Sequence, residues 1–236
     1  FQALAALLDR DRNAATDDLL AARTDTDPEV RGQAASLLCQ TGDPRAADAL
    51  TALLDDLVPR VRLQAAVGLA QLGDQRALDE LRSATTEPST RLDAAQGLAR
   101  LDHAPATEAL HALLERKLAG PAVQATAAAG LAARGDLRGQ RRLDHMVRSW
   151  RRSPSLHAVL AATALAGPRM TLFLARVSVA GGRRSQEAFA GLCELAADPA
   201  RQRQVTLLSG RQDNIGRCCL AALEEAEAAA RDGSPP

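Results

Sequence analysis

The chain has 236 residues, of which 46% are hydrophobic and only 2% aromatic, and its formal net charge is zero. A net charge of zero argues against a protein that binds polyanions through its overall charge, and the shortage of aromatic side chains requires a core of leucine, valine and alanine. The four cysteines have no Cys-x-x-Cys spacing, which argues against a disulfide scaffold and favours a reducing compartment, the cytoplasm.

Two further features concern the origin of the chain and its relation to membranes. The chain begins with Phe1 inside a helical pattern and not with methionine, so we expect a region of a larger protein. Only Lys117 among the 29 basic residues is lysine, a bias typical of a GC-rich, bacterial genome. The longest apolar run, residues 156–167, is too short to span a membrane.

Helical patterns of apolar residues occupy most of the chain. Asn13 can cap a first helix that ends near residue 23, and a second helix spans 28–41. Three further helix pairs are predicted at 44–56 with 59–72, 75–86 with 88–101 and 104–118 with 121–134. No useful length of sequence alternates apolar and polar residues as a strand does, so the sequence predicts an all-α protein.

The second helix of each predicted pair carries the same signals at its two ends. Prolines suit the first helical turn, and glycines suit the position after the last turn. The prolines recur every 29 to 33 residues, at Pro28, Pro59, Pro88, Pro121 and Pro154, and Gly42, Gly73, Gly135 and Gly167 follow four of them at 13 or 14 residues. A two-helix unit with a period near 31 is typical of an α-solenoid, with an ordinary helical bundle as the alternative.

Three copies of the repeat resemble the Asp-x-x-Val-Arg signature of HEAT repeats: Asp27-Pro28-Glu29-Val30-Arg31, Val58-Pro59-Arg60-Val61-Arg62 and Glu87-Pro88-Ser89-Thr90-Arg91. The ending Leu72-Gly73-Asp74 resembles the bilin-lyase-type (PBS lyase) HEAT-like repeats in particular. The resemblance covers residues 13–167. It implies a right-handed α-solenoid of stacked antiparallel helix pairs, with about five to six repeats and C-terminal capping helices.

The same resemblance assigns structural roles to charged residues. In the family, the acid before the proline and the arginine after it usually form a ladder between neighbouring repeats. The residues that would form this ladder are Asp27, Arg31, Arg62, Glu87 and Arg91. We therefore expect these side chains to hold the repeats together.

The proline and glycine pattern ends in the last quarter of the chain. We predict a HEAT-like solenoid over residues 1–184 and a C-terminal helical cap with a frayed tail over 185–236, within the same continuous domain. A long polar helix over 215–231 suits a cap that closes one end of a solenoid.

The stretch from Asp136 to Arg184 contains ten arginines but only two acidic residues. Residues 1–135 carry 14 basic and 19 acidic side chains, and residues 136–236 carry 15 and 10. The candidate partner-binding residues in this basic segment are Arg141, Arg142, Arg148, Trp150, Arg151, Arg152, Arg183 and Arg184. The segment suits an acidic protein or nucleic-acid phosphates, and solvated arginines on outer helix faces are the alternative.

The sequence contains no recognisable catalytic or metal-binding motif. None of the four histidines is followed by glutamate, which is the pair that marks HEAT-like iron hydroxylases. HEAT-like DNA glycosylases use aromatic and acidic residues in a basic cleft, a role that Trp150 and Asp144 would have to fill. Bilin lyases share the repeat, but a shared scaffold does not carry its function with it. We therefore expect no metal and no cofactor.

The leading hypothesis is a non-enzymatic scaffold that binds a protein or peptide as the HEAT-repeat region of a larger protein. One alternative is a nucleic-acid-binding solenoid that uses the Arg138–Arg184 segment. The other is a bilin-lyase-like or glycosylase-like enzyme subunit, which a pocket gathering Asp144, Trp150 and either His145 or His157 would support.

Overall fold

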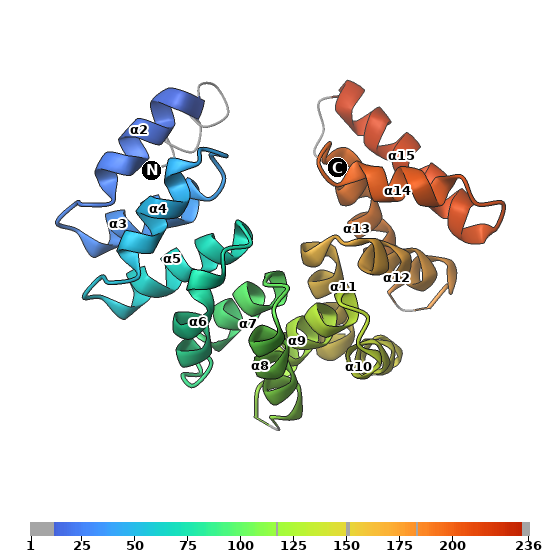
Figure 1. Ribbon diagram of the computed structural model, residues 1–236. Coiled ribbons are helices and arrows are strands. Elements are labelled where there is room, and N and C mark those ends of the chain that lie inside the picture. Colours follow the sequence, from blue (N-terminus) through green and yellow to red (C-terminus); the bar gives the residue numbers. More distant parts are fainter. Residues whose placement is uncertain (1–11, 117, 150–151, 183, 233–236) are drawn as a thin grey trace. The chain divides into compact units, whose positions relative to one another are not determined.

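The computed structural model describes residues 12–116, 118–149, 152–182 and 184–232 (Figure 1). These residues form fourteen α-helices and one short 3-10 helix, and no strand occurs within them. The all-α prediction is therefore confirmed. The helices group into two compact units, Phe1–Arg116 and Lys117–Pro236. None of the helices described is long and apolar enough to cross a membrane.

The helices of the first unit form two layers. Helices α3, α5 and α7 stack side by side in one layer, and α2, α4, α6 and α8 alternate with them along the chain (Figure 1). The bounds are α2 (Arg12–Ala22), α3 (Pro28–Leu38), α4 (Arg45–Leu53), α5 (Pro59–Gln71), η1 (Gln75–Ala77), α6 (Leu78–Ala84), α7 (Arg91–Arg100) and α8 (Ala104–Glu115).

The second unit repeats the same arrangement. Helices α9, α11, α13 and α15 stack in that order, and α10, α12 and α14 lie beside them. The bounds are α9 (Pro121–Ala133), α10 (Leu137–Arg148), α11 (Arg152–Leu165), α12 (Pro168–Val179), α13 (Ser185–Ala197), α14 (Gln202–Ser209) and α15 (Asn214–Asp232). Each unit is thus a stack of helix pairs, which is the α-solenoid that the repeat predicts.

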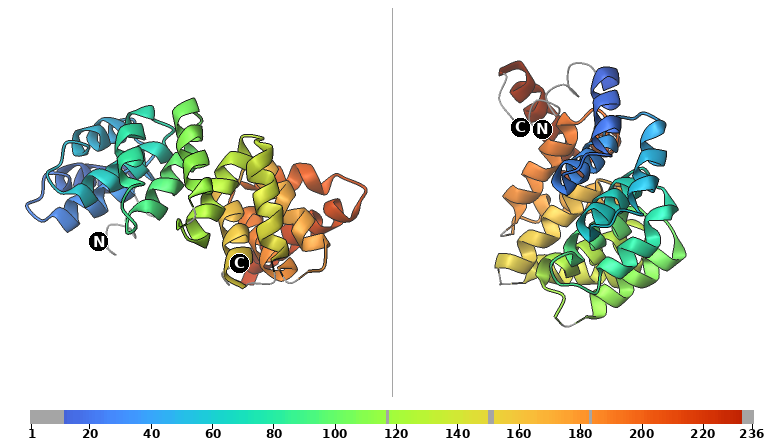
Figure 2. Two further views of the ribbon diagram at one scale, coloured as in Figure 1. Left: turned by 90° about the horizontal axis from the view of Figure 1, so that it is seen from below. Right: turned by 90° about the vertical axis from the view of Figure 1, so that its left-hand side faces the viewer.

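Residue 184, the predicted boundary between the solenoid and its cap, lies within the second unit, Lys117–Pro236. Helix α13 packs on α11 and α15 packs on α13, so residues 185–232 extend the same stack. The orange and red helices lie beside the yellow ones in the left view of Figure 2. The stack continues without the proline and glycine pattern because small buried residues, including Ala188, Gly191 and Ala222, still let the helices approach.

Glycine and aspartate set the ends of the repeated helices. Gly42, Gly73 and Gly135 have φ of 74°, 76° and 89°, the left-handed region that favours glycine after a helix. Asp27 caps α3, because its side chain accepts a hydrogen bond from Glu29 N at 2.8 Å. Helix α7 begins at Arg91, three residues after the predicted start.

Leucines of one layer fill the space above glycines of the other. A Cβ added to Gly68 of α5 would lie 3.2 Å from the side chain of Leu50 on α4. Leu81 on α6 lies above Gly97 of α7 in the same way. Both leucines are fully buried. The repeat therefore places a leucine opposite a glycine at equivalent positions of successive pairs, which brings the two layers close together.

Candidate functional site

Arg31, Arg62 and Arg91, each three residues after a repeat proline, bind the turn that precedes their own helix. Arg31 donates to the carbonyl oxygens of Asp25 and Thr26, at 2.8 and 3.2 Å. Arg62 donates to those of Asp56 and Leu57, and Arg91 to those of Thr85 and Thr86. In all three copies the acceptors lie six and five residues before the arginine, so this guanidinium closes the turn between the two layers.

Only Arg31 also makes a bidentate ion pair with the next repeat. Its Nε and Nη2 donate to the two carboxylate oxygens of Asp56, at 2.7 and 2.9 Å. The side chains are 16% and 8% exposed. Thr85 occupies the equivalent position one repeat later, so Arg62 has no matching carboxylate there and instead lies 3.4 Å from Glu80.

Asp27 and Glu87 do not have the ladder role that the resemblance assigned to them. The side chain of Asp27 caps its own helix. Glu87 is exposed, and its backbone carbonyl accepts from Thr90. The acid of the inter-repeat pair is Asp56, which lies three residues before its proline and not directly before it. Asp27, directly before Pro28, is at the N-cap of α3, where its carboxylate is used by the helix itself.

A second series of charged residues joins neighbouring repeats and was missed in the sequence. Arg45 pairs with Asp43 at 2.8 Å and with Asp17 of the preceding repeat at 2.9 Å. Arg76 pairs with Asp74 at 2.5 Å and lies 3.6 Å from Asp48, again one repeat earlier. The signal is a Gly-Asp-x-Arg motif at residues 42–45 and 73–76, in which the arginine reaches back across the stack.

Removing the Asp56 carboxylate should reduce the acid sensitivity of the first unit. The pKa of Asp56 is lowered, chiefly because Arg31 donates a side-chain hydrogen bond to it. The stability that a lowered pKa contributes is present above the unfolded pKa, near 4, and is lost as the pH falls toward the folded pKa. We expect the free energy of unfolding of Asp56→Asn to fall less than that of the parent between about pH 5 and about pH 3 in urea titrations. The exposed neighbour Asp55 supplies the control Asp55→Asn, which should keep the parental pH dependence.

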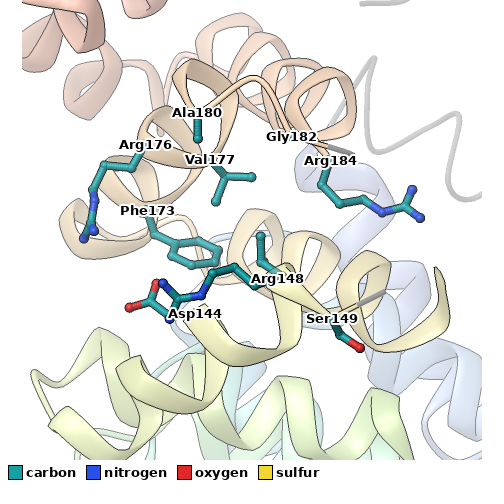
Figure 3. Close-up of a pocket in the computed structure, with 10 residues that line it drawn as sticks. Asp144, Arg148, Ser149, Phe173, Arg176, Val177, Ala180, Gly182 and Arg184 are labelled. Carbon is teal, nitrogen blue, oxygen red and sulfur yellow. The ribbon is translucent and has the colours of Figure 1, made fainter. Parts of the chain in front are cut away.

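The residues of the basic segment that come together line a pocket of about 520 Å³ between α10 and α12, which we call the α10–α12 pocket (Figure 3). Val147, Phe173 and Val177 supply its apolar surface, and the ring of Phe173 points into it. Its charged lining comprises Asp144, Arg148, Arg176 and Arg184, and Ser149, Ala180 and Gly182 complete it.

Helical spacing brings these side chains to one place. Val147 and Arg148 follow Asp144 by three and four residues, so all three share one face of α10. Phe173, Arg176, Val177 and Ala180 share one face of α12 for the same reason. The pocket thus forms where these two faces approach each other, and the spacing is the sequence signal that could have revealed it.

The arginines of the pocket differ in their availability. Arg184 is buried, forms an ion pair with Glu187, and turns its guanidinium away from Phe173 in Figure 3. Arg148 and Arg176 are exposed, and within the described ranges neither forms an ion pair. Figure 3 shows Arg148 beside Asp144 at the lower edge of the pocket and Arg176 at one side. Two arginines and one aspartate therefore remain at the rim, an excess of one positive charge.

Two other predicted members of the basic segment, Arg141 and Arg142, do not line this pocket. Arg141 is exposed elsewhere on α10. Arg142 is half-buried and donates to Gln124 Oε1 of α9 at 2.6 Å. Trp150, Arg151 and Arg183 lie outside the described residues, as does the side chain of Arg152, the first residue of α11.

Arg142 occupies a position that the repeat uses for packing. Its partner Gln124 lies 18 residues earlier, the same separation that joins Arg62 to Glu80. We expect Arg142→Met to lower the free energy of unfolding by about 1–2 kcal/mol, because Gln124 loses a charged hydrogen-bond donor. Urea denaturation followed by circular dichroism measures this change. Arg141→Met should alter it by less than about 0.5 kcal/mol, since Arg141 is exposed. Equal effects of the two substitutions would contradict the packing role of Arg142.

The pocket only partly matches the arrangement required by the enzyme alternative. It contains Asp144 but neither His145 nor His157, and Trp150 lies outside the described residues. Across the described part of the chain, no three histidine, cysteine, aspartate or glutamate side chains are placed to hold a metal ion.

Stacked helix pairs, turn-closing arginines and glycine-capped helices define an α-solenoid. Residues 16–92 match the family model for HEAT repeats, which confirms the resemblance over this part of the chain. No match was found among curated proteins.

Three solved structures are similar to this chain. The chain is similar to the complex of CpcE and CpcF of phycocyanin lyase from Nostoc sp. PCC7120, with 20% identity, 89% of this chain and 87% of that chain covered, and a TM-score of 0.52. An engineered protein is 19% identical over 90% of this chain and 96% of its own, with a TM-score of 0.40. Human deoxyhypusine hydroxylase in complex with glycerol is 18% identical over 94% and 99%, with a TM-score of 0.41. The first similarity supports the solenoid fold.

Proposed function

We propose that this chain is a non-enzymatic HEAT-repeat scaffold that binds a protein or peptide partner. The observation that supports this proposal is the α10–α12 pocket. The pocket has an apolar lining and two exposed arginines, Arg148 and Arg176. Several other charged side chains of the helix stack are instead used in packing between helices. A pocket of about 520 Å³ accepts a side chain of a partner together with its neighbouring backbone.

The repeat architecture suits this role for a physical reason. Each helix pair is held by its neighbours, so the packing energy is distributed along the stack and individual surface positions are not required for folding. Exposed side chains can therefore serve a partner at little cost in stability. An anchor that fills an apolar pocket with charged groups at its rim is the usual arrangement of a strong contact between proteins.

Nucleic-acid binding is the second candidate, because residues 136–236 carry five more basic than acidic side chains. This function requires several arginines directed at a phosphate backbone. The described arginines are distributed differently: Arg142 contacts Gln124, Arg184 pairs with Glu187, and Arg141 lies away from the pocket. The protein-binding proposal requires only Arg148 and Arg176, which are exposed at the α10–α12 pocket.

Selection from a randomised displayed peptide library against the immobilised chain tests the proposal. We expect enrichment of peptides that bind saturably in solution and that withstand moderate salt, since part of their binding energy is apolar. Duplex DNA and single-stranded RNA of random sequence, measured by fluorescence polarisation, serve as the comparison. Failure to enrich any peptide, together with nucleic-acid binding that falls steeply with salt, would overturn the proposal in favour of the second candidate.

A further inference from the structure

We infer that the α10–α12 pocket recognises an acidic peptide segment: one apolar side chain inserts against Phe173, and a neighbouring carboxylate binds Arg148 and Arg176. This inference rests on the proposed function and specifies the chemistry of the partner. It follows from the apolar surface of the pocket, the charges at its rim and its dimensions.

The apolar part of the pocket selects an apolar anchor. Val147 on α10 and Phe173 and Val177 on α12 face the same space, and Figure 3 shows the Phe173 ring directed into it. Water in contact with these side chains is released when an apolar group replaces it, which favours binding in proportion to the apolar surface buried. A leucine or phenylalanine side chain fits a space of about 520 Å³ and leaves room for the flanking backbone.

The rim selects the charge beside the anchor. Arg148 and Arg176 are exposed and belong to different helices, so a carboxylate that enters between α10 and α12 can approach both guanidinium groups. Charge-assisted hydrogen bonds from arginine to a carboxylate are the strong class of polar contact at interfaces. Asp144, on the same edge as Arg148, offsets one of the two positive charges of the rim. A single carboxylate next to the anchor therefore suits this rim better than a run of phosphates.

The geometry also distinguishes a peptide from a nucleic acid. A nucleic-acid strand presents a negative charge at every nucleotide and requires a row of cations along its path. The pocket offers two available arginines opposed by one aspartate, whereas Arg184 is already paired with Glu187. Apolar contact and one charge pair favour a short amphipathic acidic peptide.

Defined peptides and matched protein variants test this inference. The probe is a fluorescein-labelled peptide with one central phenylalanine and one neighbouring glutamate. It is compared with the same peptide carrying glutamine in place of the glutamate and with one carrying alanine in place of phenylalanine. Affinity is measured by fluorescence polarisation on the full chain. We expect both altered peptides to bind at least about tenfold more weakly, a difference of about 1.4 kcal/mol.

The protein variants remove charge inside or outside the pocket. Arg148→Gln with Arg176→Gln should weaken binding of the glutamate peptide at least about tenfold and bring it close to the affinity of the glutamine peptide. The control is Arg60→Gln with Arg203→Gln, which removes two exposed arginines that lie outside the pocket and should leave the affinity within about twofold. Circular dichroism and thermal unfolding establish that both double variants fold.

The outcomes separate this inference from the proposed function. If the library yields peptides that lack acidic residues, or if the two double variants weaken binding equally, the acidic-peptide inference is wrong while peptide binding itself stands. If no peptide binds and the nucleic-acid probes do, both proposals fail. A charge exchange provides the strongest support: Arg148→Glu with Arg176→Glu should bind a lysine version of the peptide more tightly than the glutamate version.

Discussion

Leu50→Ala should destabilise the first unit by about 2–5 kcal/mol, the range for truncation of a fully buried leucine. Leu50 fills the space above Gly68, where the second helix offers no side chain of its own. Because glycine cannot move a side chain into the vacated volume, the cavity should persist and the loss should lie in the upper part of the range. Urea denaturation monitored by circular dichroism measures the change.

Leu57→Ala is the matched control for this effect. Leu57 is 95% exposed, so its truncation removes little buried surface and should change the free energy of unfolding by less than about 0.5 kcal/mol. A loss below about 1 kcal/mol for Leu50→Ala would show that α4 and α5 do not pack through this pair. The leucine-on-glycine packing would then not describe the repeat.

In the second unit, Gly139→Ala is expected to destabilise by about 1–3 kcal/mol. A Cβ at residue 139 would lie 2.6 Å from Ala128 O and from Leu131 Cβ, and 2.7 Å from Ala132 N. These atoms belong to α9, and two of them are backbone atoms, so the helix as a whole must move. Alanine favours the helix by about 1 kcal/mol relative to glycine, which offsets part of the loss. Thermal unfolding should show a fall of several degrees, at about 2–4 °C for each kcal/mol.

Gly210→Ala provides the comparison at a glycine with room for a side chain. The nearest heavy atom to its added Cβ is Leu207 O at 3.8 Å, an ordinary contact. This variant should unfold within about 1 °C of the parent. If Gly139→Ala were equally neutral, the close approach of α9 and α10 would have to be rejected.

Much of the fold could be predicted because the repeat marks its own helix ends. Proline and glycine act locally, so Pro59 and Gly73 place the ends of α5 without knowledge of any distant contact. The start of α7 was predicted too early because Thr90 belongs to a turn, where its hydroxyl donates to Ala84 O at 2.8 Å. The extent of the last helix pairs could not be predicted from this pattern, since α13 and α15 stack through small buried residues and not through the repeat signals.

The candidate site was predictable only in part, because a run of arginines in the sequence does not form a single surface on a helix. Arg141 and Arg142 are adjacent in the chain but about 100° apart around α10, so one is exposed and the other contacts α9. Arg176 and Phe173, which were not among the predicted partner-binding residues, join the pocket through the helical periodicity of α12. Residues three or four positions apart share a face of a helix. This spacing groups Asp144 with Arg148 and Phe173 with Val177.

The resemblance to HEAT repeats predicted charged residues at the repeat junctions but assigned some of the partners incorrectly. The arginines at residues 31, 62 and 91 all close a turn, whereas the acid that joins two repeats at Arg31 is Asp56. Which of several nearby acids an arginine selects depends on the path of the turn between two helices. That path is a tertiary property, so the consensus signature does not determine it.

The most direct test of the protein-binding account is hydrogen–deuterium exchange of the full chain with and without a saturating peptide from the library selection. The account predicts slower exchange at the end of α10, over residues 144–149, and along α12, over residues 173–182, because these segments line the pocket. Exchange in α3, α5 and α7 should be unchanged. Protection confined to those helices of the first unit, with none at the α10–α12 pocket, would contradict the account.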